Sequence, residues 1–187
     1  TLPLTPAQVL WINMGTSSTR GLALAFEPAE RGIMNRRPRP PSEALLSGFF
    51  VWRVLMVSVL MMTGALGLFL WELNTGTSTE TARTMAVNAM VVAEMFYLVN
   101  SRFILQSVLR RDGLTGNRYV LLALAACIPL QLAYTHMPTM QAIFNSTDLT
   151  LLEWCKVLAA GLLVFFVAEL EKFIVRRTRF AARLSLA

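Results

Sequence analysis

Five long apolar segments, separated by short polar ones, make up most of the chain. They run approximately over 6–26, 44–71, 85–108, 118–134 and 151–175. A helix needs about 20 residues to cross the hydrocarbon core of a bilayer, which is about 30 Å thick. Each segment is long enough to span it when some tilt is allowed. We therefore expect an all-α membrane protein, a bundle of five transmembrane helices that forms a single membrane domain over 1–187.

The composition excludes most other classes. Hydrophobic residues make up 55% of the chain and charged residues 15%, whereas a soluble domain carries about a quarter charged residues. Cys127 and Cys155 stand far apart in apolar surroundings, so we interpret them as packing residues rather than a disulfide. His136 is the one histidine, and it does not make a zinc site with them.

Basic residues are concentrated in alternate connecting segments, which indicates an orientation. Segments 29–42 and 102–118 and the tail after 171 are rich in Lys and Arg, whereas 72–84 has only Arg83 and 137–150 has neither. Short basic loops stay on the cytoplasmic side of a membrane. We therefore predict an outside N-terminus and a cytoplasmic C-terminus. The excess of 17 Lys and Arg over 11 Asp and Glu then reflects topology, and we expect no nucleic-acid partner.

The first apolar segment contains a polar stripe. Asn13, Thr16, Ser17 and Arg20 recur at offsets of three, four and seven residues, which places them on one face of a helix. Polar residues at membrane depth are costly unless they face protein or a watery cavity. We expect the run 15–21, with a glycine at each end, to break the helix and free carbonyls as ion ligands. The alternative is that the Ser and Thr hydroxyls bond their own backbone and bend the helix.

A carboxylate lies near the middle of the third segment. Glu94 follows the apolar run Met90–Ala93, and an ionisable residue at this depth is a candidate for function. Tyr97 and Ser101 share its helical face. We favour a role for Glu94 in cation or proton ligation. The alternatives are a structural ion pair with Arg20, or a protonated carboxyl group bonded to a neighbouring helix.

The other polar and small residues within the segments have structural interpretations. Arg53 stands near the start of the second segment, and we expect it to extend to the cytoplasmic surface. Glu169 and Lys172 have the spacing of an ion pair along one helix. Gly64 and Gly67 predict the close approach of another helix to the second segment.

Several runs carry a family resemblance. The run Leu2–Met14, LPLTPAQVLWINM, resembles the start of the sixth transmembrane helix of P-type cation-transporting ATPases of the calcium-pump-like subclass, and Ala23–Pro28 resembles its cytoplasmic exit. Glu94 with Asn100-Ser101 resembles the eighth helix, and Glu169–Arg176 resembles the end of the tenth. The resemblance covers essentially the whole chain, so its five segments correspond to the sixth to tenth helices. Bacterial members are the most similar.

The resemblance implies a cation site. Asn13 and Thr16 match positions that ligate cations in the family's sixth helix, and Glu94 matches a ligating glutamate of the eighth. Ser17 stands where the calcium pumps have an aspartate, and Arg20 ends the stretch where they have a glycine-leucine-proline run. These departures remove one negative charge and add a positive one. Two-calcium binding is therefore less expected than one cation, a monovalent ion or a proton.

The resemblance also implies that the chain is the downstream part of a longer protein. The family phosphorylates an aspartate in an Asp-Lys-Thr-Gly-Thr motif, which this sequence lacks. We therefore expect no cofactor in this chain, and ATP and Mg²⁺ to act in the full-length parent. Its partners would be the bilayer of a bacterial plasma membrane, the transported cation (calcium or another small cation), and the upstream helices and cytoplasmic domains. A stand-alone membrane scaffold or regulator derived from such a pump, or a small proton or cation carrier, is the alternative.

Overall fold

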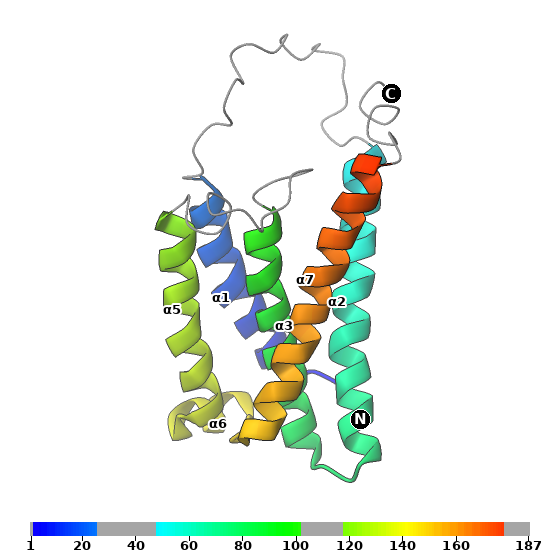
Figure 1. Cartoon of the computed structure of the whole chain (residues 1–187). Helices are drawn as coiled ribbons and strands as arrows, with labels where there is room; N and C mark the ends of the chain where they lie inside the picture. The colour runs from blue at the N-terminus through cyan, green and yellow to red at the C-terminus, as the bar shows by residue number, and fades with distance from the viewer. Residues whose placement is uncertain (1, 26–47, 102–117, 178–187) are drawn as a thin grey trace.

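The computed structural model describes residues 2–25, 48–101 and 118–177, without the side chains of 15–20, 22–24, 49 and 176. All regular structure in these ranges is helical, as expected (Figure 1). The helices are α1 (Pro6–Ala25), α2 (Gly48–Asn74), α3 (Thr79–Ser101), α5 (Arg118–His136), α6 (Pro138–Phe144) and α7 (Leu151–Arg177). The parts of the expected segments at 26, 44–47 and 102–108 lie outside the described residues.

Four of the described helices are long and apolar enough to cross a membrane: α2, α3, α5 and α7. α1 is also long enough, because its 20 residues reach about 30 Å at a rise of 1.5 Å per residue. It is not among the four, and its run at 15–20 is polar. The all-helical membrane architecture is thus confirmed, and the count of five spans stays a prediction.

The start of α3 and the presence of α6 depart most from the sequence-based expectation. α3 begins at Thr79, earlier than the predicted 85, because the backbone N–H of Thr81 donates to Ser78 Oγ at 3.1 Å and caps the helix. Such capping residues lie in the polar loop, outside the apolar stretch that marks a span.

The sequence did not predict α6, a helix of 7 residues. It ends at Asn145, whose φ of 53° is left-handed.

α3 is the central helix. In its most apolar stretch of 18 residues, 61% of the residues are buried, whereas 22% to 28% are buried in the corresponding stretches of α2, α5 and α7. α2 and α7 pack against one side of it, and α1 and α5 pack against the other (Figure 1). Met85, Ala89 and Val92 face the first pair, and Val87 and Val91 face the second. The two sides of α3 therefore bury two separate apolar clusters.

α3 and α7 approach closely at Gly161. A Cβ atom there would lie 2.6 Å from Val92 Cγ1 and 3.0 Å from Phe96 Cδ2, so glycine is required. Small residues at such crossings allow the backbones to approach and to gain van der Waals contact. Gly64 and Gly67 of α2 do not have this role, because no described atom lies within 4 Å of their Cβ positions. That expectation is wrong because α2 packs through a different face.

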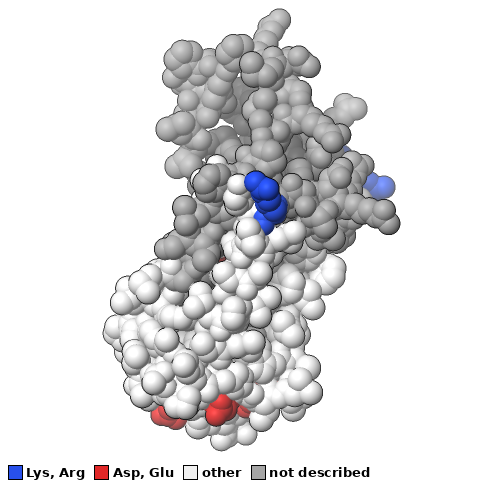
Figure 2. Space-filling model, turned by 90° about the vertical axis from the view of Figure 1, so that its left-hand side faces the viewer, with Lys and Arg blue, Asp and Glu red and all other residues white. Residues whose placement is uncertain are grey.

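The two ends of the bundle differ in charge. The end that contains the turn 75–78 and α6 is named the acidic end, after Glu72, Glu80, Asp148 and Glu153. The opposite end is named the basic end, after Arg53, Arg118, Lys172 and Arg177. Figure 2 shows acidic side chains at the first end and basic side chains toward the second. α1, α3 and α7 run from the acidic end to the basic end, and α2 and α5 run in the opposite direction (Figure 1).

Candidate cation site

The first turn of α1 and one of its faces hold it against the bundle. Thr5 and Gln8 cap the helix: the N–H of Thr5 donates to Gln8 Oε1 at 2.9 Å, and the N–H of Gln8 donates to Thr5 Oγ1 at 3.3 Å. Such a capping box satisfies N–H groups that the first turn leaves open. Ile12 is then buried among Val87 and Val91 of α3. α1 is therefore fixed beside the central helix.

Asn13 and Thr16 follow this contact along α1. Asn13 is the residue after Ile12, so it is rotated by about 100° from the packed face, and its side chain is exposed. It has no hydrogen-bond partner within the part of the chain that the structure describes. Thr16 stands about one turn beyond Ile12, and its side chain lies outside the described residues.

α1 continues through the predicted break. Its backbone is helical from Pro6 to Ala25, so the expectation that the run 15–21 interrupts the helix is wrong. A continuous helix satisfies its own carbonyl groups in hydrocarbon, where water cannot do so. Side-chain oxygens, rather than freed carbonyls, are then the ligands that α1 can offer. The predicted pair of Arg20 with Glu94 falls outside the described residues, because the Arg20 side chain does.

Glu94 lies on the face of α3 that turns toward α1. It follows Val87 by seven positions and Val91 by three, and both of these pack with Ile12. Residues at such spacings share one face of a helix. Because α1 and α3 run in the same direction (Figure 1), Thr16 follows Ile12 along α1 toward the same end of the bundle as Glu94 follows Val91 along α3. The Glu94 side chain is half-buried and its Oε2 oxygen is buried.

A buried polar network lies beside this interface, and the sequence did not predict it. The amide of Asn88 accepts a hydrogen bond from Gln131 Nε2 at 2.9 Å and donates one to Thr135 Oγ1 at 3.1 Å, which joins α3 to α5. The indole N–H of Trp11 donates to Gln131 Oε1 at 3.3 Å, which adds α1. These bonds satisfy polar groups for which hydrocarbon offers no partner. They hold three helices in register on the acidic-end side of Glu94.

Charged side chains join α3 to α7 at the basic end. Lys172 Nζ lies 3.1 Å from Glu169 Oε1 and donates to the backbone carbonyl of Asn100 at 2.7 Å. Asn100 Nδ2 donates to the same Glu169 oxygen at 2.8 Å. The predicted pairing of Glu169 with Lys172 is confirmed, and Asn100 extends it to the central helix. Since Asn100 lies less than two turns beyond Glu94, the contact also fixes the height of Glu94 in the bundle.

Arg53 does not extend to the membrane surface, so that expectation is wrong. Its side chain is 8% exposed, and its Nη2 atom lies 2.6 Å from Glu171 Oε2 of α7. A carboxylate on a neighbouring helix satisfies the guanidinium group inside the bundle, so the side chain need not reach water. The contact ties α2 to α7 at the basic end.

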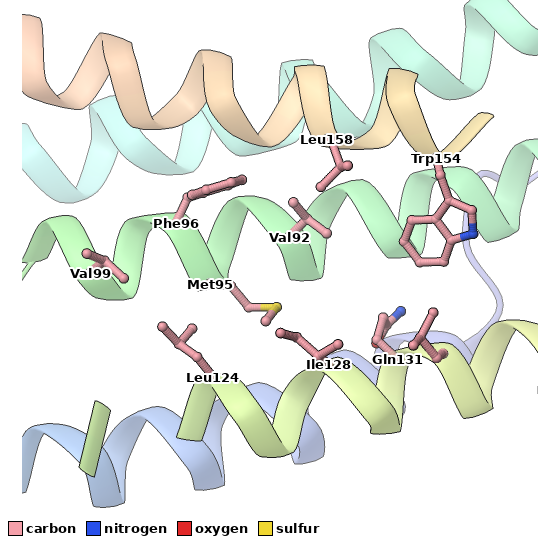
Figure 3. Close-up of a pocket in the computed structure, with 10 residues that line it drawn as sticks. Val92, Met95, Phe96, Val99, Leu124, Ile128, Gln131, Trp154 and Leu158 are labelled. Carbon is pink, nitrogen blue, oxygen red and sulfur yellow. The ribbon is translucent and has the colours of Figure 1, made fainter. Parts of the chain in front are cut away.

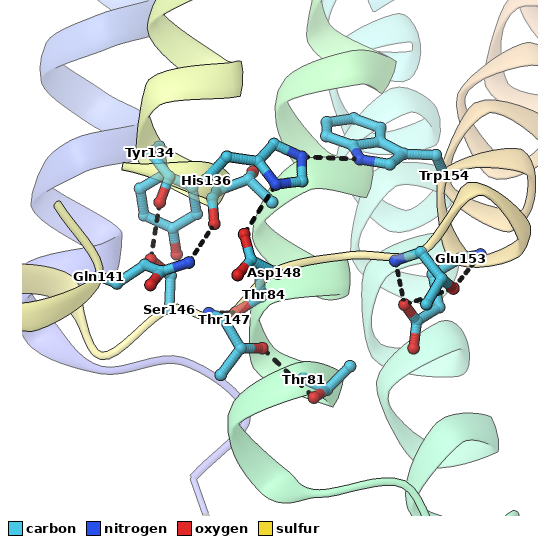
Figure 4. Close-up of polar contacts among 12 residues, drawn as sticks. Thr81, Thr84, Tyr134, His136, Gln141, Ser146, Thr147, Asp148, Glu153 and Trp154 are labelled. Atoms are coloured by element: carbon cyan, nitrogen blue, oxygen red, sulfur yellow. Dashed lines mark hydrogen bonds and ion pairs between the residues drawn. The ribbon is translucent and has the colours of Figure 1, made fainter. Parts of the chain in front are cut away.

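The segment after α6 crosses the acidic ends of α3 and α5 (Figure 4). The Ser146 hydroxyl donates to the carbonyl of Tyr134 at 2.7 Å, and the N–H of Thr147 donates to Thr84 Oγ1 at 3.0 Å. At the start of α7, Thr150 and Glu153 form a second capping box, in which the N–H of Thr150 donates to Glu153 Oε2 at 2.6 Å. These contacts fix the acidic ends of the helices relative to one another.

Comparison with known proteins identifies relatives of this chain. The model of the family described as cation transporting ATPase, C-terminus, matches residues 1–174. The probable cation-transporting ATPase F of Mycobacterium tuberculosis is 40% identical over 175 residues, which cover 94% of this chain and 19% of the relative. The cation-transporting ATPase pma1 of Synechocystis is 34% identical over 158 residues, which cover 82% and 18%. The human calcium-transporting ATPase type 2C member 1 is 29% identical over 174 residues, which cover 93% and 19%.

The matched range extends from the residues before α1 into the last turns of α7, and it contains all three predicted ligands. The chain spans about 19% of the length of these curated relatives. The family resemblance inferred from the sequence is confirmed. This chain belongs to the family formed by the C-terminal membrane regions of P-type cation-transporting ATPases.

Proposed function

We propose that this chain is the C-terminal part of the membrane domain of an ATP-driven cation pump, and that Asn13, Thr16 and Glu94 contribute ligands to one transported cation. The observation that carries the proposal is the position of Glu94, inside the central helix about two turns before its end at Ser101 and on its α1 face. An ionisable group is costly at this depth, and such groups mark ion pathways. ATP and Mg²⁺ would act in the rest of the pump.

α1 would also span the membrane, which brings the number of transmembrane helices in this chain to five. It packs along α3 and α5 rather than across their ends (Figure 1), and its 20 residues suffice for a span of about 30 Å. A polar stripe is tolerated in such a helix where it faces other helices or a watery cavity. The upstream helices of the pump would cover this stripe, including the exposed Asn13.

Three side chains do not complete the coordination of a hard cation. Ca²⁺ takes about six to eight oxygen ligands, and Asn13, Thr16 and Glu94 together offer about half of these. The upstream helices would supply the others. Ser17 carries no charge and Arg20 adds a positive charge, so this stretch carries less negative charge than the matching stretch of the calcium pumps. The difference supports transport of one calcium ion or another small cation, a monovalent ion or a proton, rather than two calcium ions.

The basic end would face the cytoplasm of a bacterium and the acidic end the outside of its plasma membrane. The charge difference between the two ends supports this orientation, because short loops rich in Lys and Arg stay on the cytoplasmic side. The N-terminus of α1 would then lie outside and the C-terminus inside.

ATP-driven uptake of cations into inside-out membrane vesicles that contain the intact protein tests the proposal. Wild-type vesicles should accumulate at least one of Ca²⁺, Mn²⁺, Na⁺, K⁺ or protons. Glu94→Gln and Asn13→Ala should abolish that uptake while the protein stays inserted. Glu80→Gln in the first turn of α3 and Asn74→Ala at the end of α2 are the matched controls, and both should transport normally.

Two results would overturn the proposal. The first is the absence of ATP-driven uptake of any of these cations by the intact protein. The second is normal uptake by both Glu94→Gln and Asn13→Ala. In the second case the polar stripe and the carboxylate would have a structural role.

A further inference from the structure

An apolar groove lies between α3, α5 and α7 (Figure 3). Its volume is about 390 Å³, which is within the range of pockets that hold small ligands. Met95 and Val99 of α3 lie at its floor, Ile128 lies on the α5 wall, and Leu158 lies on the α7 wall. Ile128 and Leu158 are also exposed, so the groove opens on the surface of the described bundle.

The groove offers hydrocarbon contacts and few free polar atoms. Gln131 is the one amide in its lining, and both ends of that amide are already bonded, to Asn88 and to Trp11. Trp154 also lines the groove, and its indole N–H donates to His136 Nε2 at 3.3 Å. A cavity of this kind stays dry and takes apolar groups. An empty groove would forfeit the dispersion contacts of its lining.

The size of the groove fits a single hydrocarbon chain. Along α5 it extends from Leu124 to Leu132, which is about 12 Å at 1.5 Å per residue, close to one leaflet of a core about 30 Å thick. A methylene group takes about as much space as a water molecule, roughly 30 Å³, so the groove holds about a dozen.

The acidic end of the groove is polar and has the character of a membrane interface. Trp154 stands there, in the second turn of α7 and bonded to His136, as in the aromatic belts that mark the boundary between hydrocarbon and headgroups. His136 Nδ1 lies 2.8 Å from Asp148 Oδ1 (Figure 4). A ligand that enters from this side would therefore place a polar head beside charged and polar groups and an apolar tail along α3.

We propose that this groove binds one acyl chain of a phospholipid from the leaflet at the acidic end, with the headgroup beside His136 and Asp148. The bound chain fills the space between α5 and α7 over the central helix. The proposal requires that the chain is embedded in a bilayer, and it does not depend on the assignment of the cation ligands.

Photo-crosslinking of the intact protein tests this site. The probe is phosphatidylcholine with a diazirine in the middle of one acyl chain, present as a small fraction of phosphatidylcholine vesicles, and adducts are mapped by mass spectrometry. Wild-type protein should carry adducts on the floor residues Met95 and Val99. Ile128→Trp, which fills the groove, should reduce floor adducts about tenfold, which corresponds to about 1.4 kcal/mol of binding free energy. Adducts on the exposed face of α2 at Leu55 and Val59 should not change.

Leu122→Trp is the matched control, because Leu122 is on α5, is 62% exposed and does not line the groove. It should leave the floor adducts at the wild-type level. Leu158→Trp repeats the test from the opposite wall if Ile128→Trp fails to fold. The proposal is wrong if floor residues carry no adducts while α2 does, since another helix or protein then covers the groove. It is also wrong if the filled variants and the control label equally.

Discussion

Lys156 Nζ lies 2.6 Å from Glu72 Oε1, and this ion pair joins α7 to α2 at the acidic end. The Glu72 side chain is 2% exposed, and its second oxygen accepts a hydrogen bond from Thr77 Oγ1 at 3.2 Å. At the basic end, Arg53 and Glu171 join the same two helices. Because α2 and α7 run in opposite directions, the antiparallel pair is fastened near both of its ends.

Breaking the acidic-end pair from one side should destabilise the protein. Lys156→Met leaves the buried Glu72 carboxylate without its cation, and we expect a cost below the about 3–5 kcal/mol typical of a fully buried pair, since Lys156 is 29% exposed. Adding Glu72→Gln should recover part of the loss, and Lys156→Arg should be mild. Thermal unfolding of the intact protein in detergent measures each effect. Additive effects of the two changes would show that the pair contributes no coupling energy.

The glycine at the crossing of α3 and α7 should not tolerate a methyl group. Gly161→Ala places a carbon against Val92 Cγ1, and overpacking of this kind costs about 1–3 kcal/mol. Val92→Ala should suppress the defect by removing the group that clashes. Gly67→Ala is the control, and it should cause no loss of thermal stability, because its Cβ position has open space. Equal losses for the two alanine variants would contradict the packing at Gly161.

Lys172 should be the most sensitive charge at the basic end, because its side chain is fully buried. Lys172→Met removes the ammonium group that contacts both Glu169 and the Asn100 carbonyl, so we expect a cost near the about 3–5 kcal/mol of a broken buried pair. Arg177→Met on the same helix, where the side chain is exposed, should cost much less. Thermal unfolding of the intact protein measures both effects. Similar melting temperatures for Lys172→Met and Arg177→Met would argue against the contact of Lys172 with Glu169 and Asn100.

The proposed orientation predicts the accessibility of the loops. After replacement of Cys127 and Cys155, single cysteines at Thr77 and Gln141 should react with an impermeant thiol reagent in intact cells. Cysteines at Arg39 and Thr115 should react only after the cells are opened. Labelling at position 39 in intact cells would reverse the orientation.

Features that depend on nearby residues could be predicted from the sequence. Apolar length alone located α2, α3, α5 and α7, because a span must satisfy its own backbone within one segment. The pair Glu169–Lys172 could be predicted because its partners are three positions apart on one helix. Glu94 is a predicted ligand because an ionisable group inside an apolar run is costly and often marks an ion pathway, and its role stays a prediction.

Features that depend on packing could not be predicted. The partner of Arg53 is Glu171, far along the chain, and no local pattern connects the two. The network of Asn88 with Gln131 likewise joins separate helices, although the spacing of Gln131 and Thr135 on an apolar helix was a signal that could have been used. Gly161 and Gly67 look alike in sequence, and only the neighbouring atoms distinguish a required glycine from a tolerated one.

Cation-dependent phosphorylation of the intact protein by ATP tests the proposal that Glu94 ligates a transported cation. The measurement is the concentration of the activating cation that gives half-maximal phosphoenzyme in wild type, Glu94→Gln and the control Glu80→Gln. We predict that Glu94→Gln loses cation-dependent phosphorylation while it stays folded and inserted, and that Glu80→Gln matches wild type. Wild-type cation dependence in Glu94→Gln would show that the Glu94 carboxylate is not a cation ligand and has a structural role.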